Sequence, residues 1–267
     1  MCLLVLAWQA HSRYRLILAA NRDEFHERPS SPLARWADRP SILGGRDLRA
    51  GGTWLALDEE RRLGIVTNYR DLQSSPPGAP SRGELIPSYL LQAHGAVAST
   101  TRLAPGVDAY AGFNLLLFDE RELSYLTNRA TPRARALPPG IYALSNHLLD
   151  TPWPKVTRVR RGFESWLART DLEAGAPDTA ALFALLADRT PAADQAELPH
   201  SGLSAEWERV LSSPFVLNPS YGTRSSTVVL LERHGGASIR ERRFDPGGEL
   251  TGETVIVLAP GEWPRMD

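Results

Sequence analysis

The chain has 267 residues, of which 42% are hydrophobic and 23% are charged, and its net charge is -1. This balance is typical of a globular protein with a sizeable core. The lack of a basic excess argues against a nucleic-acid partner. The apolar start has no basic leader, and no later run is long enough to span a bilayer, so we expect a cytoplasmic protein without a membrane span.

The single cysteine is Cys2, directly after the initiator methionine. One cysteine allows neither an internal disulfide nor a multi-cysteine metal site. If the methionine is removed, Cys2 carries a thiol and a free α-amine, whose ordinary pKa of about 7.7–8.0 suits it to accept the thiol proton. A small buried residue at the start of a strand fits the same position.

Two β-leaning runs, residues 3–8 and 14–20, predict an N-terminal hairpin. The second run leads directly into Asn21-Arg22-Asp23-Glu24. Counting the register from a turn near residues 10–13 pairs Cys2 with roughly position 21. Arg22 would lower the pKa of a neighbouring thiol, and the carboxylate of Asp23 would bind an α-ammonium group. We therefore expect a thiol pKa below the ordinary value of about 8.5.

A Pro- and Arg-rich segment follows, and then glycine-marked turns at Gly44-Gly45 and Gly51-Gly52. Neither glycine pair precedes a helix, so we predict no phosphate-binding loop. Residues 53–57 and 63–68 predict a second hairpin. Ser81 and Glu84 form a capping box that predicts one helix through about Ala98.

The rest of the chain continues with hairpins and with helices grouped between them. The expected elements are a hairpin over 112–128, a strand at 141–145, helices at 154–167 and 178–189, and strands at 224–233, 237–244 and 254–258. This order predicts an α+β fold with mainly antiparallel sheets, and residues 1–267 as a single domain.

The histidines do not form paired metal ligands. His26, His94, His147, His200 and His234 are spread without the spacing that a metal site needs. Among the tryptophans, Trp36 and Trp54 flank the expected cleft and are candidates for an apolar pocket lining. We expect no metal and no cofactor.

A set of short motifs, in order along residues 1 to about 230, resembles the NRDE family, the family of the transport and Golgi organisation 2 protein. The motifs are Met1-Cys2, Ala20–Phe25 (ANRDEF), Gly51–Trp54 (GGTW), Thr67–Arg70 (TNYR), Arg82–Leu85 (RGEL), Gly112–Leu115 (GFNL), Leu144–Asn146 (LSN), Asp150–Lys155 (DTPWPK) and Gly222–Ser226 (GTRSS). Each motif is weak alone, and together they are specific.

This resemblance implies an N-terminal-nucleophile hydrolase fold, an αββα sandwich similar to choloylglycine hydrolases and penicillin V acylases. Those enzymes cleave amides with an N-terminal cysteine. By resemblance, Cys2 is the nucleophile, Asp23 holds the α-amine, Asn68 contributes its side-chain amide to an oxyanion hole, Asn146 orients the reacting groups and Arg224 matches the late arginine of the site.

Arg22 departs from that pattern, because the acylases place their arginine three residues before the aspartate. Neighbouring residues on a strand face opposite sides. If Asp23 faces the site, Arg22 therefore faces it only where the strand bulges or has ended.

The sequence is compatible with two functions. The first is an N-terminal cysteine amidohydrolase acting on an amide or thioester of a small acyl compound. The alternative is a non-catalytic protein that binds or carries haem or an acyl lipid, in which Cys2 is a thiolate ligand or a structural residue. Fold alone does not separate them, and the sequence leaves the oligomeric state open.

Overall fold

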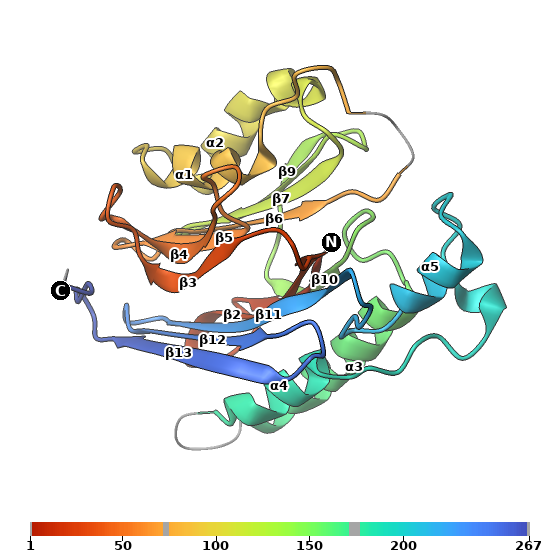
Figure 1. Cartoon of the computed structure of the whole chain (residues 1–267). Coiled ribbons are helices and arrows are strands. Elements are labelled where there is room, and N and C mark those ends of the chain that lie inside the picture. The colour runs from red at the N-terminus through yellow and green to blue at the C-terminus, as the bar shows by residue number, and fades with distance from the viewer. Residues whose placement is uncertain (1, 72–74, 171–176, 266–267) are drawn as a thin grey trace.

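The computed structural model describes residues 2–71, 75–170 and 177–265. Two antiparallel sheets, one of six strands and one of seven, pack face to face. Helices cover the outer face of each sheet, so the chain forms the four layers visible in Figure 1. The predicted α+β class and the αββα sandwich are confirmed.

The first sheet has the strand order β10-β1-β2-β11-β12-β13, and the second runs from β3 to β9 in chain order. The strands of the first sheet are β1 (Cys2–Trp8), β2 (Tyr14–Phe25), β10 (Gly140–Leu144), β11 (Tyr221–Glu232), β12 (Ala237–Phe244) and β13 (Leu250–Leu258). Those of the second are β3 (Ser30–Arg35), β4 (Ile42–Asp47), β5 (Leu55–Asp58), β6 (Leu63–Asn68), β7 (Phe113–Phe118), β8 (Leu123–Thr127) and β9 (Ala134–Ala136).

The helices divide between the two outer layers and one end of the molecule. The α-helices are α1 (Leu85–Leu90), α2 (Ala96–Leu103), α3 (Pro154–Thr170), α4 (Thr179–Leu186) and α5 (Ala205–Val210), and short 3₁₀ turns span Arg82–Glu84, Ala104–Ala109 and Gln195–Glu197. α1 and α2 cover the second sheet, whereas α3 and α4 cover the first. Within the described ranges, no helix has the length and apolar character needed to cross a bilayer.

Strand β1 is apolar throughout because both of its faces are buried. Leu4 and Leu6 point into the core between the sheets, while Leu3 and Val5 point toward α3 and α4. Side chains that alternate along this one strand thus belong to two separate hydrophobic cores, one between the sheets and one beneath the helices. The strand holds its first residue, Cys2, at a fixed place between the layers.

Two local predictions are wrong. The single helix expected from the capping box is divided: Ser81 caps only a 3₁₀ turn, α1 ends at Leu90, and Gly95 caps the start of α2. Gly44 and Gly45 lie inside β4 rather than in a turn. A Cβ on Gly45 would lie 2.4 Å from the Trp54 ring, so this strand needs glycine for close packing.

The β1–β2 register differs by one residue from the sequence estimate. Cys2 lies opposite Arg22, and Leu3 lies opposite Asn21. A shift of one residue exchanges the two faces of a strand. Residues directly opposite each other share a face, so Cys2 and Arg22 both point between the sheets. On the other side of β2, strand β11 has an irregular register between Thr223 and Ser225.

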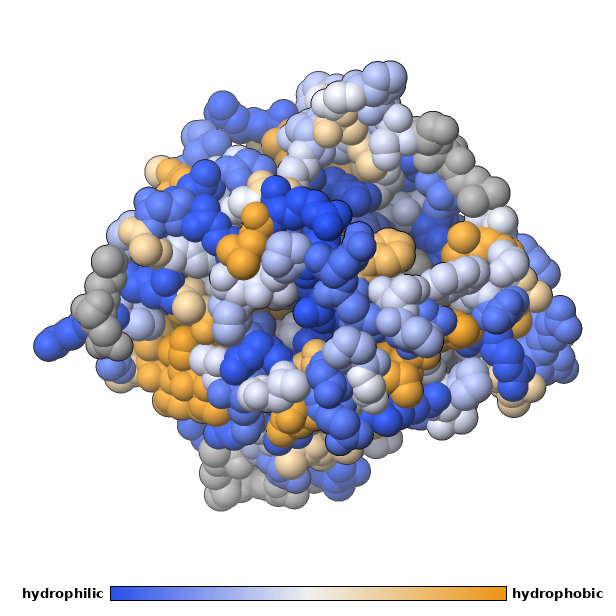
Figure 2. Space-filling view, viewed as in Figure 1, coloured by the Kyte–Doolittle hydropathy of each residue, from blue (hydrophilic) through white to orange (hydrophobic). Residues whose placement is uncertain are grey.

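The surface is mostly polar. In Figure 2, hydrophilic residues cover much of the displayed face, and apolar surface gathers toward the lower left, where β12 and β13 lie in Figure 1. β13 is the last strand of its sheet, and Val255 and Val257 are among its exposed side chains.

Candidate active site

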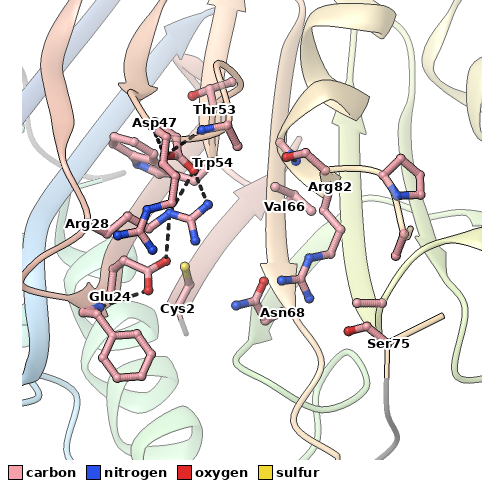
Figure 3. Close-up of a pocket in the computed structure, with 18 of the residues that line it drawn as sticks. Cys2, Glu24, Arg28, Asp47, Thr53, Trp54, Val66, Asn68, Ser75 and Arg82 are labelled. Atoms are coloured by element: carbon pink, nitrogen blue, oxygen red, sulfur yellow. Dashed lines mark hydrogen bonds and ion pairs between the residues drawn. The ribbon is translucent and has the colours of Figure 1, made fainter. Parts of the chain in front are cut away.

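The open end of the β1–β2 hairpin faces a cavity of about 830 Å³ between the two sheets. Cys2 and Arg22 line it from the first sheet, and Trp54 and Asn68 line it from the second. Figure 3 shows Cys2 across the cavity from Asn68 and Arg82. The fold therefore brings together residues that are far apart in sequence around the only cysteine of the chain.

Cys2 is 9% exposed. Burial raises the pKa of its thiol, and the negative charge of Asp23 acts in the same direction. Nearby positive charge, including that of Arg22, and a backbone hydrogen bond from Asp23 act in the opposite direction without reversing the shift. The expectation of a lowered thiol pKa is wrong for this structure, because the desolvation of a buried thiolate outweighs the neighbouring cations.

Arg22 faces the cavity. Its guanidinium group lies over the Trp54 ring, 4.2 Å from the ring centroid. Nη1 is buried and has no hydrogen-bond partner among the described residues. The register explains this orientation without a bulge in β2, because Cys2 and Arg22 are directly opposite. Gly45 leaves room for the Trp54 ring that supports the guanidinium group.

Asp23 is 1% exposed, and its carboxylate is held from strand β11. Oδ1 accepts a 2.7 Å hydrogen bond from Oγ1 of Thr223, which in turn accepts from the backbone N–H of Val216. The Tyr221 hydroxyl donates to the backbone carbonyl of Asp23 at 2.9 Å. These bonds hold the carboxylate beside the start of β1, on the face of β2 opposite to Arg22, and the residue itself also borders the cavity.

Asn68 and Asn146 are connected, although only Asn68 lines the cavity. Nδ2 of Asn146 donates to the Asn68 backbone carbonyl at 2.8 Å. Ser145 Oγ lies 3.0 Å from the Cys2 carbonyl oxygen and 3.2 Å from Oδ1 of Asn146. Ser145 and Asn146 therefore link the backbone of Cys2 in one sheet to the backbone of Asn68 in the other.

Arg224 lies outside the cavity lining. Its Nη1 donates to the backbone carbonyls of Phe25 and His26, at 3.1 and 2.9 Å. It sits at the irregularity of β11, beside the end of β2. This arginine supports the chain that follows Asp23, and in this structure it has no direct contact with Cys2.

Arg82 is a cavity residue to which the sequence gave no role in the site. Arg82 donates from Nη1 to the carbonyl of Gly112 at 2.9 Å, and Figure 3 shows its guanidinium group directed toward Asn68. Glu24 lies near Arg28, with Oε2 3.9 Å from Nε, and Arg28 also pairs with Asp47 at 2.6 Å. In the sequence, Arg82 lies inside the capping box and in the RGEL motif, and neither pattern gave it a role in the site.

The described residues contain no group of three or more histidine, cysteine, aspartate or glutamate side chains arranged to hold a metal ion. His147 packs between the rings of Tyr69 and Trp153. Trp54 lines the cavity, whereas Trp36 packs in the core beneath α1 and does not reach it. The side chains that line the cavity supply a thiol, carboxylates, an amide and guanidinium groups.

Comparison with known protein families shows which family the chain belongs to. Residues 1–246 match the family model described as Transport and Golgi organisation 2. The chain belongs to this family. It is 32% identical to the mouse Transport and Golgi organization 2 homolog and 34% identical to the bovine one, and each alignment covers 86% of both proteins. The Drosophila melanogaster protein is 29% identical, with 88% of this chain and 89% of that protein covered.

A solved structure shows the fold. The C2A mutant of conjugated bile acid hydrolase from Clostridium perfringens superposes with a TM-score of 0.53, over 96% of this chain and 92% of that one. The two sequences are only 7% identical, so the likeness is one of fold. It confirms that this member of the family has the N-terminal-nucleophile hydrolase fold.

Proposed function

We propose that the protein is an N-terminal cysteine hydrolase that cleaves an amide or thioester of a small acyl compound. The observation that carries the proposal is the position of Cys2 on the cavity wall, with Asp23 and Arg22 from β2 and Asn68 from the opposite sheet. The similar structure belongs to a hydrolase whose own C2A mutation removes a cysteine at position 2.

The reaction begins once Cys2 is the first residue of the chain. Its sulfur attacks the substrate carbonyl, and the thiol proton moves to the α-amine of the same residue. A C–S bond forms as negative charge develops on the carbonyl oxygen. The C–N or C–S bond of the substrate then breaks, and its leaving group takes the proton. Water attacks the resulting thioester, releasing the acid and restoring the thiol.

Each neighbouring residue has a defined task in this scheme. Asp23, held by Thr223, binds the α-ammonium group and fixes its direction. The side-chain amide of Asn68 donates to the developing oxyanion. Ser145 and Asn146 keep the Cys2 and Asn68 backbones in their relative positions. The raised thiol pKa makes the intramolecular base necessary, since few molecules carry a thiolate at neutral pH.

Two guanidinium groups of the cavity wall favour an acyl compound that also carries an anionic group. Arg22 and Arg82 line the cavity, and no ion pair joins either one to a carboxylate within the described ranges. A carboxylate or phosphate on the substrate can bind such guanidinium groups in two-point contacts. Trp54, beneath Arg22, supplies an apolar surface beside them.

Two observations favour the alternative, a non-catalytic binding protein for haem or an acyl lipid. Burial keeps the Cys2 thiol protonated, and a cavity of about 830 Å³ is large enough for either ligand. In that case Cys2→Ala retains an acyl ligand, and haem binding gives an absorbance spectrum that depends on Cys2.

The test is acylation of the protein by an activated acyl ester, p-nitrophenyl hexanoate. We expect release of p-nitrophenol, an acyl adduct on Cys2 by mass spectrometry, and no adduct in Cys2→Ala. Asn68→Ala is expected to slow acylation by about 10²–10³, the usual cost of losing one oxyanion donor. Absence of a Cys2 adduct in a chain that begins with Cys2 would contradict the hydrolase.

A further inference from the structure

Lys155 is a buried cation that the reaction described above does not use. It is the only lysine of the chain, and the other 29 basic residues are arginines. It is the second residue of α3, whose first turn contains no acidic residue. The positive end of a helix dipole is an unfavourable place for a cation. A chain that uses arginine everywhere else has a lysine at this one position.

The side chain cannot reach water. Lys155 is 1% exposed, and its Nζ has no hydrogen-bond partner among the described residues. Structural lysines usually extend the ammonium group to solvent or bind an acceptor. Neither holds for Lys155, so it lowers the stability of the fold where it stands. Groups of this kind are retained most often at functional sites.

The charges around Lys155 belong to the candidate active site and to one adjoining ion pair. α3 packs directly against β1 and β10, on the face opposite the cavity. The groups that act on Lys155 are Asp23 from β2, Cys2 from β1, and the pair formed by Arg70 and Glu208. Burial lowers the pKa of Lys155 to about 8, while Asp23, Cys2 and Glu208 partly oppose this effect and Arg70 adds to it.

We propose that Lys155 is a positioning residue of the Cys2 site, whose buried ammonium group stabilises the ionised forms of Asp23 and Cys2 from behind the β1–β2 pair. The inference rests on the proposed role of Cys2 as the reacting group. Lys155 gives up no proton in the reaction. As the thiol proton moves to the α-amine, its positive charge stabilises the negative charge that develops on sulfur.

The chemistry of the side chain explains the choice of lysine. A guanidinium group is planar and presents five donors that a closed site would have to satisfy, whereas an ammonium group is a compact charge. Lysine can also lose its proton when it is buried, which arginine cannot. The support that Lys155 gives to Cys2 is therefore expected to fade as the pH rises past about 8.

The single lysine makes a direct test possible. Protein labelled with ¹³C-lysine gives one side-chain Cε resonance, and its chemical shift against pH reports the titration of Lys155 alone. We expect a midpoint near 8 in the wild type. Asp23→Asn removes the carboxylate that favours the ammonium form, so it is expected to lower the midpoint. Glu27→Gln is the matched control, since Glu27 is an exposed carboxylate of the cavity lining that is not among the groups acting on Lys155.

A second measurement reads the effect on Cys2 and needs no substrate. Alkylation of Cys2 by iodoacetamide against pH is compared in wild type, Lys155→Met and Lys155→Arg, with Arg161→Met on the exposed face of α3 as control. We expect Lys155→Met to slow alkylation at neutral pH by roughly three- to tenfold, and we expect the difference from wild type to close as the pH rises past about 8. We expect Lys155→Arg, which keeps the positive charge but adds donors to a closed site, to alkylate at a rate between those of Lys155→Met and the wild type, and Arg161→Met to stay within about twofold of wild type.

A Lys155 midpoint near its ordinary value of 10.5 that is also unmoved by Asp23→Asn would overturn the proposal. So would an alkylation profile in Lys155→Met identical to that of the wild type. The resonance is measured with Lys155 in place, so the test stands even if Lys155→Met does not fold. Neither measurement depends on turnover, so a protein that hydrolyses nothing can still show the coupling, and the two proposals can fail separately.

Discussion

Two buried cations, Arg70 and Lys155, both interact with the negative charges of Asp23 and Glu208. Their immediate environments differ because, within the described ranges, only Arg70 of the two has an ion-pair partner. Nη1 of Arg70 is 2.6 Å from Oε2 of Glu208, and its guanidinium group stacks on Trp153 at 4.7 Å. Lys155 has neither an ion-pair partner nor a hydrogen-bond acceptor among the described residues. Arg70 therefore stabilises the fold through its ion pair, whereas Lys155 lowers the stability of the fold and acts, in our proposal, on the Cys2 site.

The largest effect is expected from breaking the scaffold pair. Glu208→Gln leaves Arg70 buried without its counter-charge, which typically costs about 3–5 kcal/mol. Chemical denaturation should show this loss of unfolding free energy, while the alkylation rate of Cys2 in the folded protein stays close to that of the wild type. A loss below about 1 kcal/mol would mean that the pair behaves like an exposed one.

The next effect distinguishes two neighbours on β2. Asn21 donates to the carbonyls of Leu186 and Pro214 and accepts from Ser226, so Asn21→Ala leaves buried groups unpaired. We expect it to lower stability by about 1–3 kcal/mol with thiol reactivity retained. Asp23→Asn should do the reverse and weaken Cys2 alkylation more than it lowers Tm. Equal loss of Tm without any change in alkylation would make both residues structural.

A smaller effect, of opposite sign, is expected for Lys155→Met. Folding lowers the pKa of Lys155 from 10.5 to about 8, so the unfolded chain binds the proton more tightly. The destabilising contribution is complete below pH 8 and fades as the pH rises toward 10.5. We expect Lys155→Met to gain about 1–3 kcal/mol at neutral pH, an advantage that shrinks at alkaline pH. A variant less stable than wild type at neutral pH would show that the ammonium group is satisfied.

The sequence predicted much of the fold, because its hairpins have clear alternation and its motifs are specific in combination. The sequence also named Cys2, Arg22, Asp23 and Asn68 as site residues, and in the structure all four line the same cavity. The orientation of Arg22 could not be settled, since a register error of one residue exchanges the faces of β2. From the sequence, the glycines of β4 were predicted to lie in turns, because the Trp54 ring that requires Gly45 comes from the residue just before another strand, β5.

The remaining parts of the site depend on tertiary contacts that leave no local pattern. Arg82 reaches the cavity from a 3₁₀ turn. The Ser145 hydroxyl binds the Cys2 carbonyl, and the Asn146 side chain carries the link on to Asn68 in the other sheet, although in the sequence Ser145 is only the middle residue of a short motif. In the sequence, Lys155 is an ordinary lysine at the start of a predicted helix. Its functional interest comes from its burial and its interaction with Asp23, which only the structure shows.

The proposed mechanism depends most on whether Cys2 has a free α-amine. The direct measurement is the intact mass of the protein purified from cells without an N-terminal tag. We expect the mass of a chain that begins at Cys2, with the initiator methionine removed. Retention of Met1 in most molecules would contradict the central claim, because an amine bound in a peptide link cannot accept the thiol proton.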